Sequence, residues 1–243
     1  MSSKTPKDQL YAFFYTTAKL FVPETVEQLS KCLDKPFIAI SKCDSIEKAK
    51  HVFSIGKATE LYDEDSSLFF LGKDGFMFHA QGVGGGLATW RFYFRRGSDE
   101  HRWVEVLKSV VETLPVLFGF MCPDAEYDEM HRSLDVPRGI SVQEFEKYLS
   151  GLYWLTFFGK ELVEYIGAKQ LSSLKGASTT KLKGGQVMLQ LDEDLFLPSY
   201  TTRIEASYKL GEQLSPGLFF APSKKRGYKQ APQLLKALED AAG

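Results

Sequence analysis

The sequence has few cysteines and no excess of either charge. It has only three cysteines, Cys32, Cys43 and Cys122, which form no C-x-x-C pair. An odd number argues against a disulfide framework, so we expect reduced thiols. Thirty basic residues face 31 acidic ones, for a net charge of -1. No overall field therefore draws the chain to a nucleic-acid backbone or to an anionic membrane.

Long hydrophobic runs are also missing near the N-terminus. The polar start leads into an apolar segment of about ten residues, which is too short to span a membrane. This segment lacks the small-residue cleavage site of a secretory signal. We therefore expect a cytoplasmic protein that does not bind membranes.

Local motifs of catalytic and metal sites are lacking as well. The glycine-rich stretch QGVGGGLATW has no Lys followed by Ser or Thr, and Leu87 replaces the third glycine of a dinucleotide fingerprint. We expect this stretch to connect two strands. The four histidines, His51, His79, His101 and His131, show no metal-binding spacing, and no G-x-S-x-G elbow occurs. The sequence thus predicts no catalytic residue, no metal site and no cofactor.

The sequence does contain well-marked strands and helices. Two apolar runs, 67–72 and 76–81, flank an Asp-Gly turn and predict a hairpin. The strand LATWRFYFRR alternates, with Ala88, Trp90, Phe92 and Phe94 on one pleat face and Thr89, Arg91, Tyr93 and Arg95 on the other. Residues 99–114 carry one apolar helical stripe, and 115–122 returns as a strand.

The remaining elements complete the predicted fold. Strands are expected over 9–17 and 37–41, with helices starting at Pro23 and over 45–53. Short helices should start at Asp124, Ser141 and Glu161, before a hairpin around Gly184-Gly185 and two last helices. Without strict β-α-β alternation, this order predicts an α+β fold, with a mixed or mainly antiparallel sheet and helices packed on it. We expect one domain over residues 1–243, with any subdivision near 122–140.

Acidic residues cluster in three runs. These are Asp63 to Asp65, then Asp124, Glu126, Asp128 and Glu129, and finally Asp192 to Asp194. Such runs serve solubility and helix capping, or they form an acidic surface for a basic partner. The basic run Lys224-Lys225-Arg226 is too short to predict direct nucleic-acid binding.

The stretch GLYWLTFFGKELVEYIG, residues 151–167, is unusually aromatic. Alternation over 152–158 places apolar side chains on both faces, as in a central strand. Gly159 permits a sharp exit, and Gly167 is expected to end the following helix in a left-handed conformation. From its residues, this stretch is a buried strand, a tight turn and a helix.

The same stretch resembles the C-terminal part of immunity proteins from bacterial polymorphic-toxin and type VI secretion systems. A tryptophan, a short apolar link, a glycine and an acidic-apolar helix recur in those proteins, although Thr156 here replaces the usual polar residue of the link. The likeness is closest to immunity protein family fifty-two and to related type VI immunity proteins. It implies a cytoplasmic α+β inhibitor, not an enzyme, that neutralises a cognate secreted toxin in a tight complex. Because family fifty-two is associated with nuclease toxins, a nuclease is the expected partner.

The resemblance directs attention to the second acidic run. A nuclease cleft is basic, so a helix presenting Asp124, Glu126, Asp128 and Glu129 could occupy it as a phosphate mimic. We expect these four residues to bind the toxin. Two alternatives remain open: a hydrolase whose site gathers His79, His131 and a carboxylate, or a non-catalytic scaffold module.

Overall fold

The computed structural model describes residues 9–33, 37–42, 51–62, 67–73, 75–94, 99–134, 142–220 and 227–243. Its strands are β1 (Leu10–Thr16), β2 (Phe37–Ser41), β3 (His51–Val52), β4 (Ser67–Gly72), β5 (Met77–Gly84), β6 (Leu87–Phe94), β7 (Val116–Pro123), β8 (Leu155–Phe158), β9 (Ser178–Lys181) and β10 (Val187–Gln190). Its helices are α1 (Pro23–Cys32), α2 (Ile55–Leu61), α3 (Glu100–Thr113), α4 (Asp124–Leu134), α5 (Val142–Phe145), α6 (Lys160–Ile166), α7 (Ala168–Ser172), α8 (Thr201–Leu214) and α9 (Pro232–Ala242).

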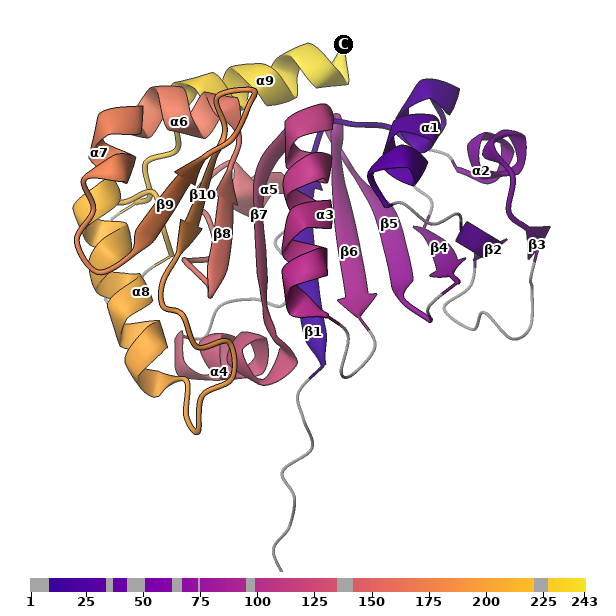
Figure 1. Ribbon diagram of the computed structural model, residues 1–243. Helices are drawn as coiled ribbons and strands as arrows, with labels where there is room; N and C mark the ends of the chain where they lie inside the picture. Colours follow the sequence, from indigo (N-terminus) through magenta and orange to yellow (C-terminus); the bar gives the residue numbers. More distant parts are fainter. Residues whose placement is uncertain are drawn as a thin grey trace, which may run out of the picture.

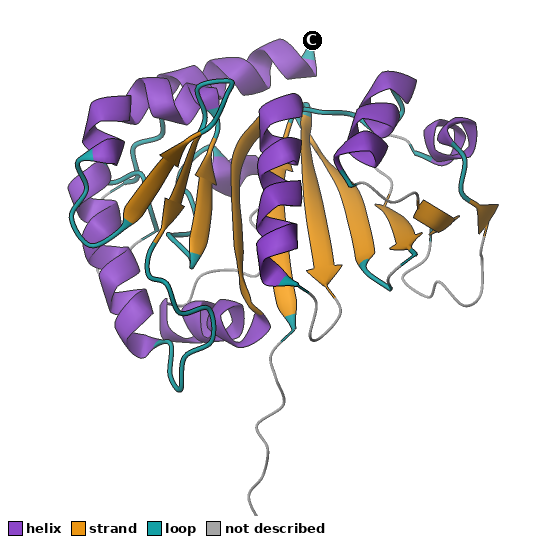
Figure 2. Cartoon of the chain, in the orientation of Figure 1, coloured by secondary structure: helices purple, strands orange, loops and turns teal. Residues whose placement is uncertain are grey.

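All the described strands belong to one sheet, in the order β3-β2-β4-β5-β6-β1-β7-β8-β10-β9 (Figures 1 and 2). Neighbouring strands pair antiparallel throughout. The predicted α+β fold with a mainly antiparallel sheet is therefore confirmed. The N-terminal strand β1 lies between β6 and β7, and the pairing of β7 with β8 joins the two halves of the chain in the same sheet.

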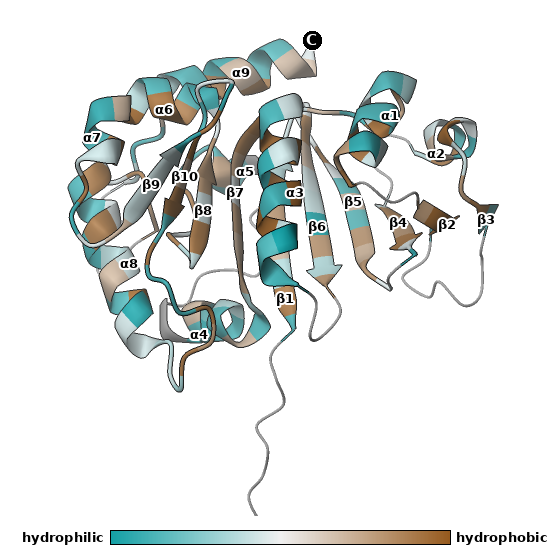
Figure 3. Cartoon of the chain, in the orientation of Figure 1, coloured by the Kyte–Doolittle hydropathy of each residue, from teal (hydrophilic) through white to brown (hydrophobic). Residues whose placement is uncertain are grey.

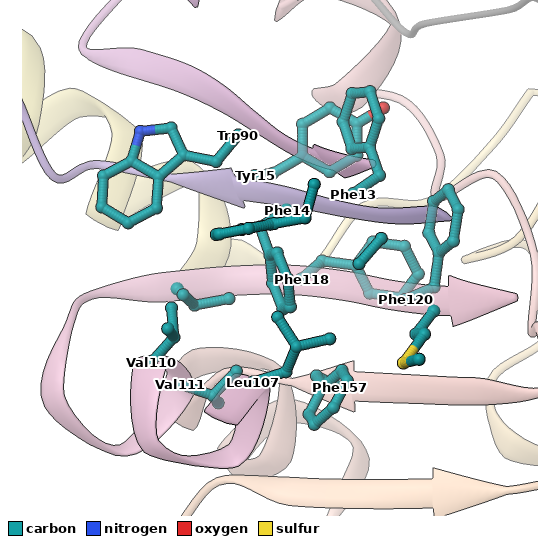
Figure 4. Packing of buried hydrophobic residues seen from close by; sticks show 14 of the residues in the cluster. Phe13, Phe14, Tyr15, Trp90, Leu107, Val110, Val111, Phe118, Phe120 and Phe157 are labelled. Carbon is teal, nitrogen blue, oxygen red and sulfur yellow. The ribbon is translucent and has the colours of Figure 1, made fainter. Parts of the chain in front are cut away.

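The alternation predicted for β6 decides which face of the sheet is buried. Trp90 and Phe92 are fully buried, and so is Phe14 of the neighbouring β1. Helix α3 crosses in front of this face (Figure 1), and Figure 4 shows its residues Leu107 and Val110 beside the aromatic core. We call this the helix face. Figure 3 shows that hydrophobic residues concentrate on the strands, while the helices alternate between hydrophobic and hydrophilic residues.

Helix α3 follows the sequence prediction closely. It begins after Asp99, whose carboxylate accepts a hydrogen bond from the Arg102 backbone N–H at 3.2 Å. Its buried stripe is Trp103, Val106, Leu107, Val110 and Val111. The Trp103 ring lies 4.4 Å from Phe94 and 5.1 Å from Phe76, centroid to centroid. The helix therefore packs with this stripe toward the sheet, because that orientation buries all of its apolar residues.

The helix predicted over 45–53 is wrong at its C-terminal end. His51 and Val52 form the edge strand β3, paired with β2, and residues 45–50 lie outside the described part of the chain. The helix begins later, at Ile55, where the Ser54 hydroxyl accepts a hydrogen bond from the Lys57 N–H at 3.1 Å. The Ser54 cap, which was not predicted, therefore sets the start of this helix.

The helix predicted from Ser141 is shorter than expected, because α5 ends at Phe145. Leu149 then leaves the helical path: its N–H donates to Leu218 O at 2.8 Å, and its carbonyl accepts from the Phe220 N–H at 2.8 Å. Ser141 itself, the predicted cap, lies outside the described residues.

The aromatic stretch is buried, as its residues predicted, but its strand starts three residues late. The backbone N–H groups of Leu152, Tyr153 and Trp154 donate to side-chain oxygens of Ser207, Thr156 and Glu126, at 3.1, 2.9 and 2.9 Å. These bonds replace sheet partners, so β8 begins only at Leu155.

The turn after β8 needs a glycine because the neighbouring backbone leaves no space for a side chain. A Cβ added at Gly159 would lie 2.2 Å from the Val116 carbonyl oxygen. Helix α6 then begins directly and ends at Ile166. The next residue, Gly167, has a positive φ of 98°, although its ψ of 121° lies outside the left-handed helical region.

Candidate functional site

The predicted acidic helix exists as α4, but its four carboxylates do not share one surface. Asp124 is exposed, while Asp128 and Glu129 are half-buried. Glu129 accepts a hydrogen bond from the Thr201 hydroxyl of α8 at 3.1 Å. Glu126 is 0% exposed. The expectation that Glu126 contacts a toxin is therefore corrected, because no partner can reach it in this fold.

Glu126 instead holds a buried ionic network. One of its carboxylate oxygens pairs with Nη1 of Arg203, and the other accepts the Trp154 backbone N–H at 2.9 Å. Asp192 binds the same guanidinium through both oxygens, at 2.8 Å to Nε and 2.9 Å to Nη2. The carbonyl groups of Leu195 and Asp194 accept further hydrogen bonds from Arg203.

This network ties α4, α8 and the chain before β8 together. Burial raises the pKa of Glu126 to about 7, while the Arg203 charge opposes that rise. The Trp154 indole N–H adds a hydrogen bond to Asp192 O at 3.1 Å. The acidic residues Glu126 and Asp192 thus serve the fold. The third acidic run is split between structure and surface, and the first, Asp63 to Asp65, lies outside the described residues.

The opposite face of the sheet contains a half-exposed polar and aromatic area. We call it the β4–β6 surface and define it by Ser67, Phe69 and Leu71 of β4, Met77, His79 and Gln81 of β5, and Thr89, Arg91 and Tyr93 of β6. Strand alternation places these nine residues on the same side. All are half-buried except His79 and Thr89, which are buried. On the helix face of the same three strands, the side chains are buried.

The same side of the sheet is covered further along, over β1 and β7. Tyr127 of α4 packs on Tyr11 at 4.8 Å and on Phe120 at 5.9 Å, and Phe145 of α5 stacks on Tyr15 at 4.3 Å. Tyr11 also contacts Tyr93 of the β4–β6 surface at 5.3 Å. Helix α4, with its outer carboxylates, therefore borders this surface.

A serine and a histidine meet within the β4–β6 surface. Ser67 Oγ lies 2.5 Å from His79 Nε2, and the Phe69 ring stacks on the imidazole at 4.1 Å. Such a pair has the geometry of a nucleophile and its base. However, burial and the Arg91 charge lower the pKa of His79 to about 4. A base this weak is poorly matched to proton abstraction at neutral pH, so the pair does not favour the hydrolase alternative.

The hydrolase alternative also required His79 to meet His131. His79 stacks with Phe69 on β5, whereas His131 of α4 packs against Tyr127 at 4.1 Å, so each histidine has its own aromatic partner. In the described ranges, His, Cys, Asp and Glu side chains form no group of three or more suited to a metal ion. None of the helices described is long and apolar enough to cross a membrane.

Arg91 and Tyr93 were not among the residues predicted to be functional, although β6 carries a signal for them. Thr89, Arg91 and Tyr93 alternate with the core residues of β6, which indicates a sheet face that is not fully buried. The basic run near Lys224 lies outside the described residues, as does Cys43, while Cys32 and Cys122 are free thiols. The glycine-rich stretch connects β5 and β6, as predicted.

Comparison with known proteins adds no assignment: no family model and no curated protein matches the chain significantly.

Proposed function

We propose that this protein is an immunity protein, which binds a cognate secreted bacterial toxin in the cytoplasm and neutralises it by forming a tight complex. The observation that carries the proposal is the β4–β6 surface. It presents Phe69, Met77, Arg91 and Tyr93, half-buried, on a rigid sheet whose other face is a packed core. Aromatic residues, Met and Arg are the types that protein interfaces concentrate at their centre.

The surroundings of this surface support the same function. Asp124, Asp128 and Glu129 lie on α4, whose Tyr127 packs on Tyr11 next to Tyr93. An aromatic centre with a charged border is the usual organisation of a protein interface, and the acidic border suits a basic partner such as a nuclease. The resemblance of residues 151–167 to toxin-immunity proteins supports this class of partner.

The proposal is tested by capture and by protection of cells. The tagged full chain is used to recover partners from a lysate of the source bacterium through a high-salt wash, and each recovered protein is then expressed alone. We expect a partner that is toxic alone and harmless when this protein is co-expressed.

Two variants locate the contact. Met77→Ser with Tyr93→Ser should abolish recovery and protection, whereas Phe196→Ser, on an apolar residue that is 47% exposed elsewhere, should leave both intact. Recovery of the same toxic partner by a folded Met77→Ser, Tyr93→Ser variant would contradict the β4–β6 surface as the contact. Failure to find any toxic partner with the wild-type chain would contradict the immunity function.

A further inference from the structure

Strand β9 forms an outer edge of the sheet, at the left of Figure 1. Within the described chain it pairs only with β10, in antiparallel register. Its side chains are exposed, except that of Thr179, which is half-buried. The strand at the opposite end of the sheet, β3, has only two residues. Strand β9 is therefore the longer of the two edges to which another strand could add.

The register decides which backbone groups of β9 face outward. The Leu182 N–H donates to Gln186 O at 2.9 Å, so these two residues form a hydrogen-bonded pair. In an antiparallel ladder, such pairs alternate with pairs whose N–H and C=O groups point away from the partner strand. Lys181 is the next residue along β9 and Thr179 lies two positions further, so both belong to pairs of the second kind. Their N–H and C=O groups therefore point away from β10.

These outward groups are the backbone N–H and C=O of Thr179 and of Lys181. None of them has a hydrogen-bond partner among the residues that the structure describes. N–H and C=O groups that alternate along an extended strand are satisfied by the backbone of a second strand. A phosphate oxygen accepts hydrogen bonds from N–H groups but leaves the carbonyl groups unpaired. The edge of β9 therefore fits a peptide backbone better than it fits a nucleic acid.

The charge around this edge indicates the kind of strand that it fits. Residues 168–186 contain no Asp or Glu, but they contain the four exposed lysines Lys169, Lys175, Lys181 and Lys183. In the described ranges, only Lys183 lies within ion-pair distance of a carboxylate, that of Glu112 at 3.6 Å. A lysine on an edge strand disfavours pairing with a second copy of the same strand. A strand that carries Asp or Glu is instead attracted to this segment.

We propose that β9 binds an extended acidic segment of another protein, which adds to the sheet as a further antiparallel strand. Main-chain hydrogen bonds to Thr179 and Lys181 provide the pairing, and a carboxylate beside the Lys181 side chain provides the specificity. Four strands, β1, β7, β8 and β10, separate β9 from β6. The site is therefore distinct from the β4–β6 surface, and it stands or falls independently of the immunity function.

Amide hydrogen exchange tests the pairing. Exchange is followed by NMR on the full isotope-labelled chain, with acetyl-Thr-Glu-Val-Glu-Val-Thr-amide as the probe. In the free protein the Thr179 and Lys181 amides should exchange rapidly, whereas those of Thr180 and Leu182, which point toward β10, should be protected. At a peptide concentration about ten times Kd, exchange at Thr179 and Lys181 should slow about tenfold.

Two matched peptides separate charge from backbone pairing. The peptide acetyl-Thr-Lys-Val-Lys-Val-Thr-amide keeps the backbone and should bind about tenfold more weakly, because its charges are reversed. The glutamate peptide with both glutamate nitrogens methylated keeps the charges and should also bind about tenfold more weakly, because it lacks two donors. Equal binding of the methylated peptide overturns strand pairing, and equal binding of the lysine peptide overturns the acidic partner.

Variants of the chain locate the site. Lys181→Glu should weaken binding of the glutamate peptide about tenfold, whereas Lys236→Glu, on an exposed position of α9, should leave it unchanged. Thr179→Pro removes an outward N–H without removing a hydrogen bond to β10, so it should also weaken binding. If Thr179→Pro does not fold, Lys181→Glu and the methylated peptide still decide between the outcomes.

Three results would overturn the site outright. The first is unchanged exchange at Thr179 and Lys181 when the glutamate peptide is added. The second is protection of both amides in the free protein that rises with protein concentration, which would assign the edge to a second copy of the chain. The third is stronger protection by a short oligothymidylate than by the glutamate peptide, which would assign the edge to a nucleic acid.

Discussion

Removal of Arg203 should destabilise the folded protein more than any other single substitution in the buried ionic network. Arg203 neutralises Glu126, whose side chain is 0% exposed, and it binds Asp192 at the rim, whose side chain is 37% exposed. Arg203→Met leaves the Glu126 carboxylate buried without its counter-charge. We expect this to lower the free energy of unfolding by about 3–5 kcal/mol, the usual cost of removing one partner of a buried ion pair.

Substitution of Glu126 or Asp192 should lower the free energy of unfolding by less than Arg203→Met does. Glu126→Gln keeps an oxygen that can accept the Trp154 N–H and leaves Arg203 paired with Asp192, so a loss of about 2 kcal/mol is expected. Asp192→Asn changes a half-exposed group and should cost about 1 kcal/mol or less. The double variant Arg203→Met, Glu126→Gln should be more stable than the sum of the single losses predicts, because it no longer buries an unpaired charge.

The pH dependence gives a second readout for Arg203→Met. Without the guanidinium, the pKa of Glu126 should rise further above the value of about 7 that it has in the intact network, far from the 4.5 of a solvated carboxyl. Between these two pKa values the folded protein holds a proton that the unfolded chain releases, so stability falls as pH rises. The loss in Arg203→Met should therefore be smaller at about pH 5 than at about pH 8.

Urea denaturation followed by tryptophan fluorescence measures all of these values. A loss below about 1 kcal/mol for Arg203→Met at about pH 8 would refute the reasoning, since the carboxylate would then not be stranded. So would strict additivity in the double variant.

Four further variants concern other parts of the molecule. The folded protein disfavours a protonated His79, whose pKa is lowered from 6.5 to about 4, so stability should fall as pH drops through this range. Urea titrations should show His79→Gln losing this dependence, which we place at about 1–2 kcal/mol after allowing for solvent screening. Gly119→Ala should cost about 1–3 kcal/mol in thermal denaturation, because its Cβ would lie 2.1 Å from a phenylalanine ring of β1. Gly56→Ala, with nothing within 4 Å in helix α2, should instead stabilise by about 0.5–1 kcal/mol, and equal effects would contradict the packing argument. Asp128→Lys with Glu129→Lys should slow association with a basic toxin about tenfold in stopped-flow experiments, and an unchanged rate with full protection would remove α4 from the interface.

Local patterns in the sequence predicted most of the elements. The alternation in β6 correctly separated Trp90 and Phe92, now in the core, from Arg91 and Tyr93, now half-exposed. The stripe of α3 likewise predicted its packing on the sheet. These predictions succeed because the spacing of hydrophobic residues along a segment can be read from that segment alone.

The sequence pattern failed where a residue's environment depends on distant parts of the chain. Glu126 sits in an acidic helix and was expected on the surface, yet Arg203 from α8 reaches it across 77 positions and holds it in the interior. Leu152 to Trp154 read as strand, but their N–H groups are taken by oxygens of three side chains, two of them far away in the chain. The hydrophobic periodicity of either segment cannot predict partners that lie far away in the sequence.

The sequence by itself determined the class of fold and the two faces of β6. The resemblance on which the proposed function draws stays a prediction. Only the tertiary structure decided which charged residues are paired inside the protein. Glu126 and Arg203 neutralise each other inside the protein, whereas no carboxylate of the described residues pairs with Arg91, whose neighbours on the adjacent strands are Phe13 and His79. The physical reason is that a charge is compensated through space, by whatever group the fold brings within a few ångströms, and not through its neighbours along the chain.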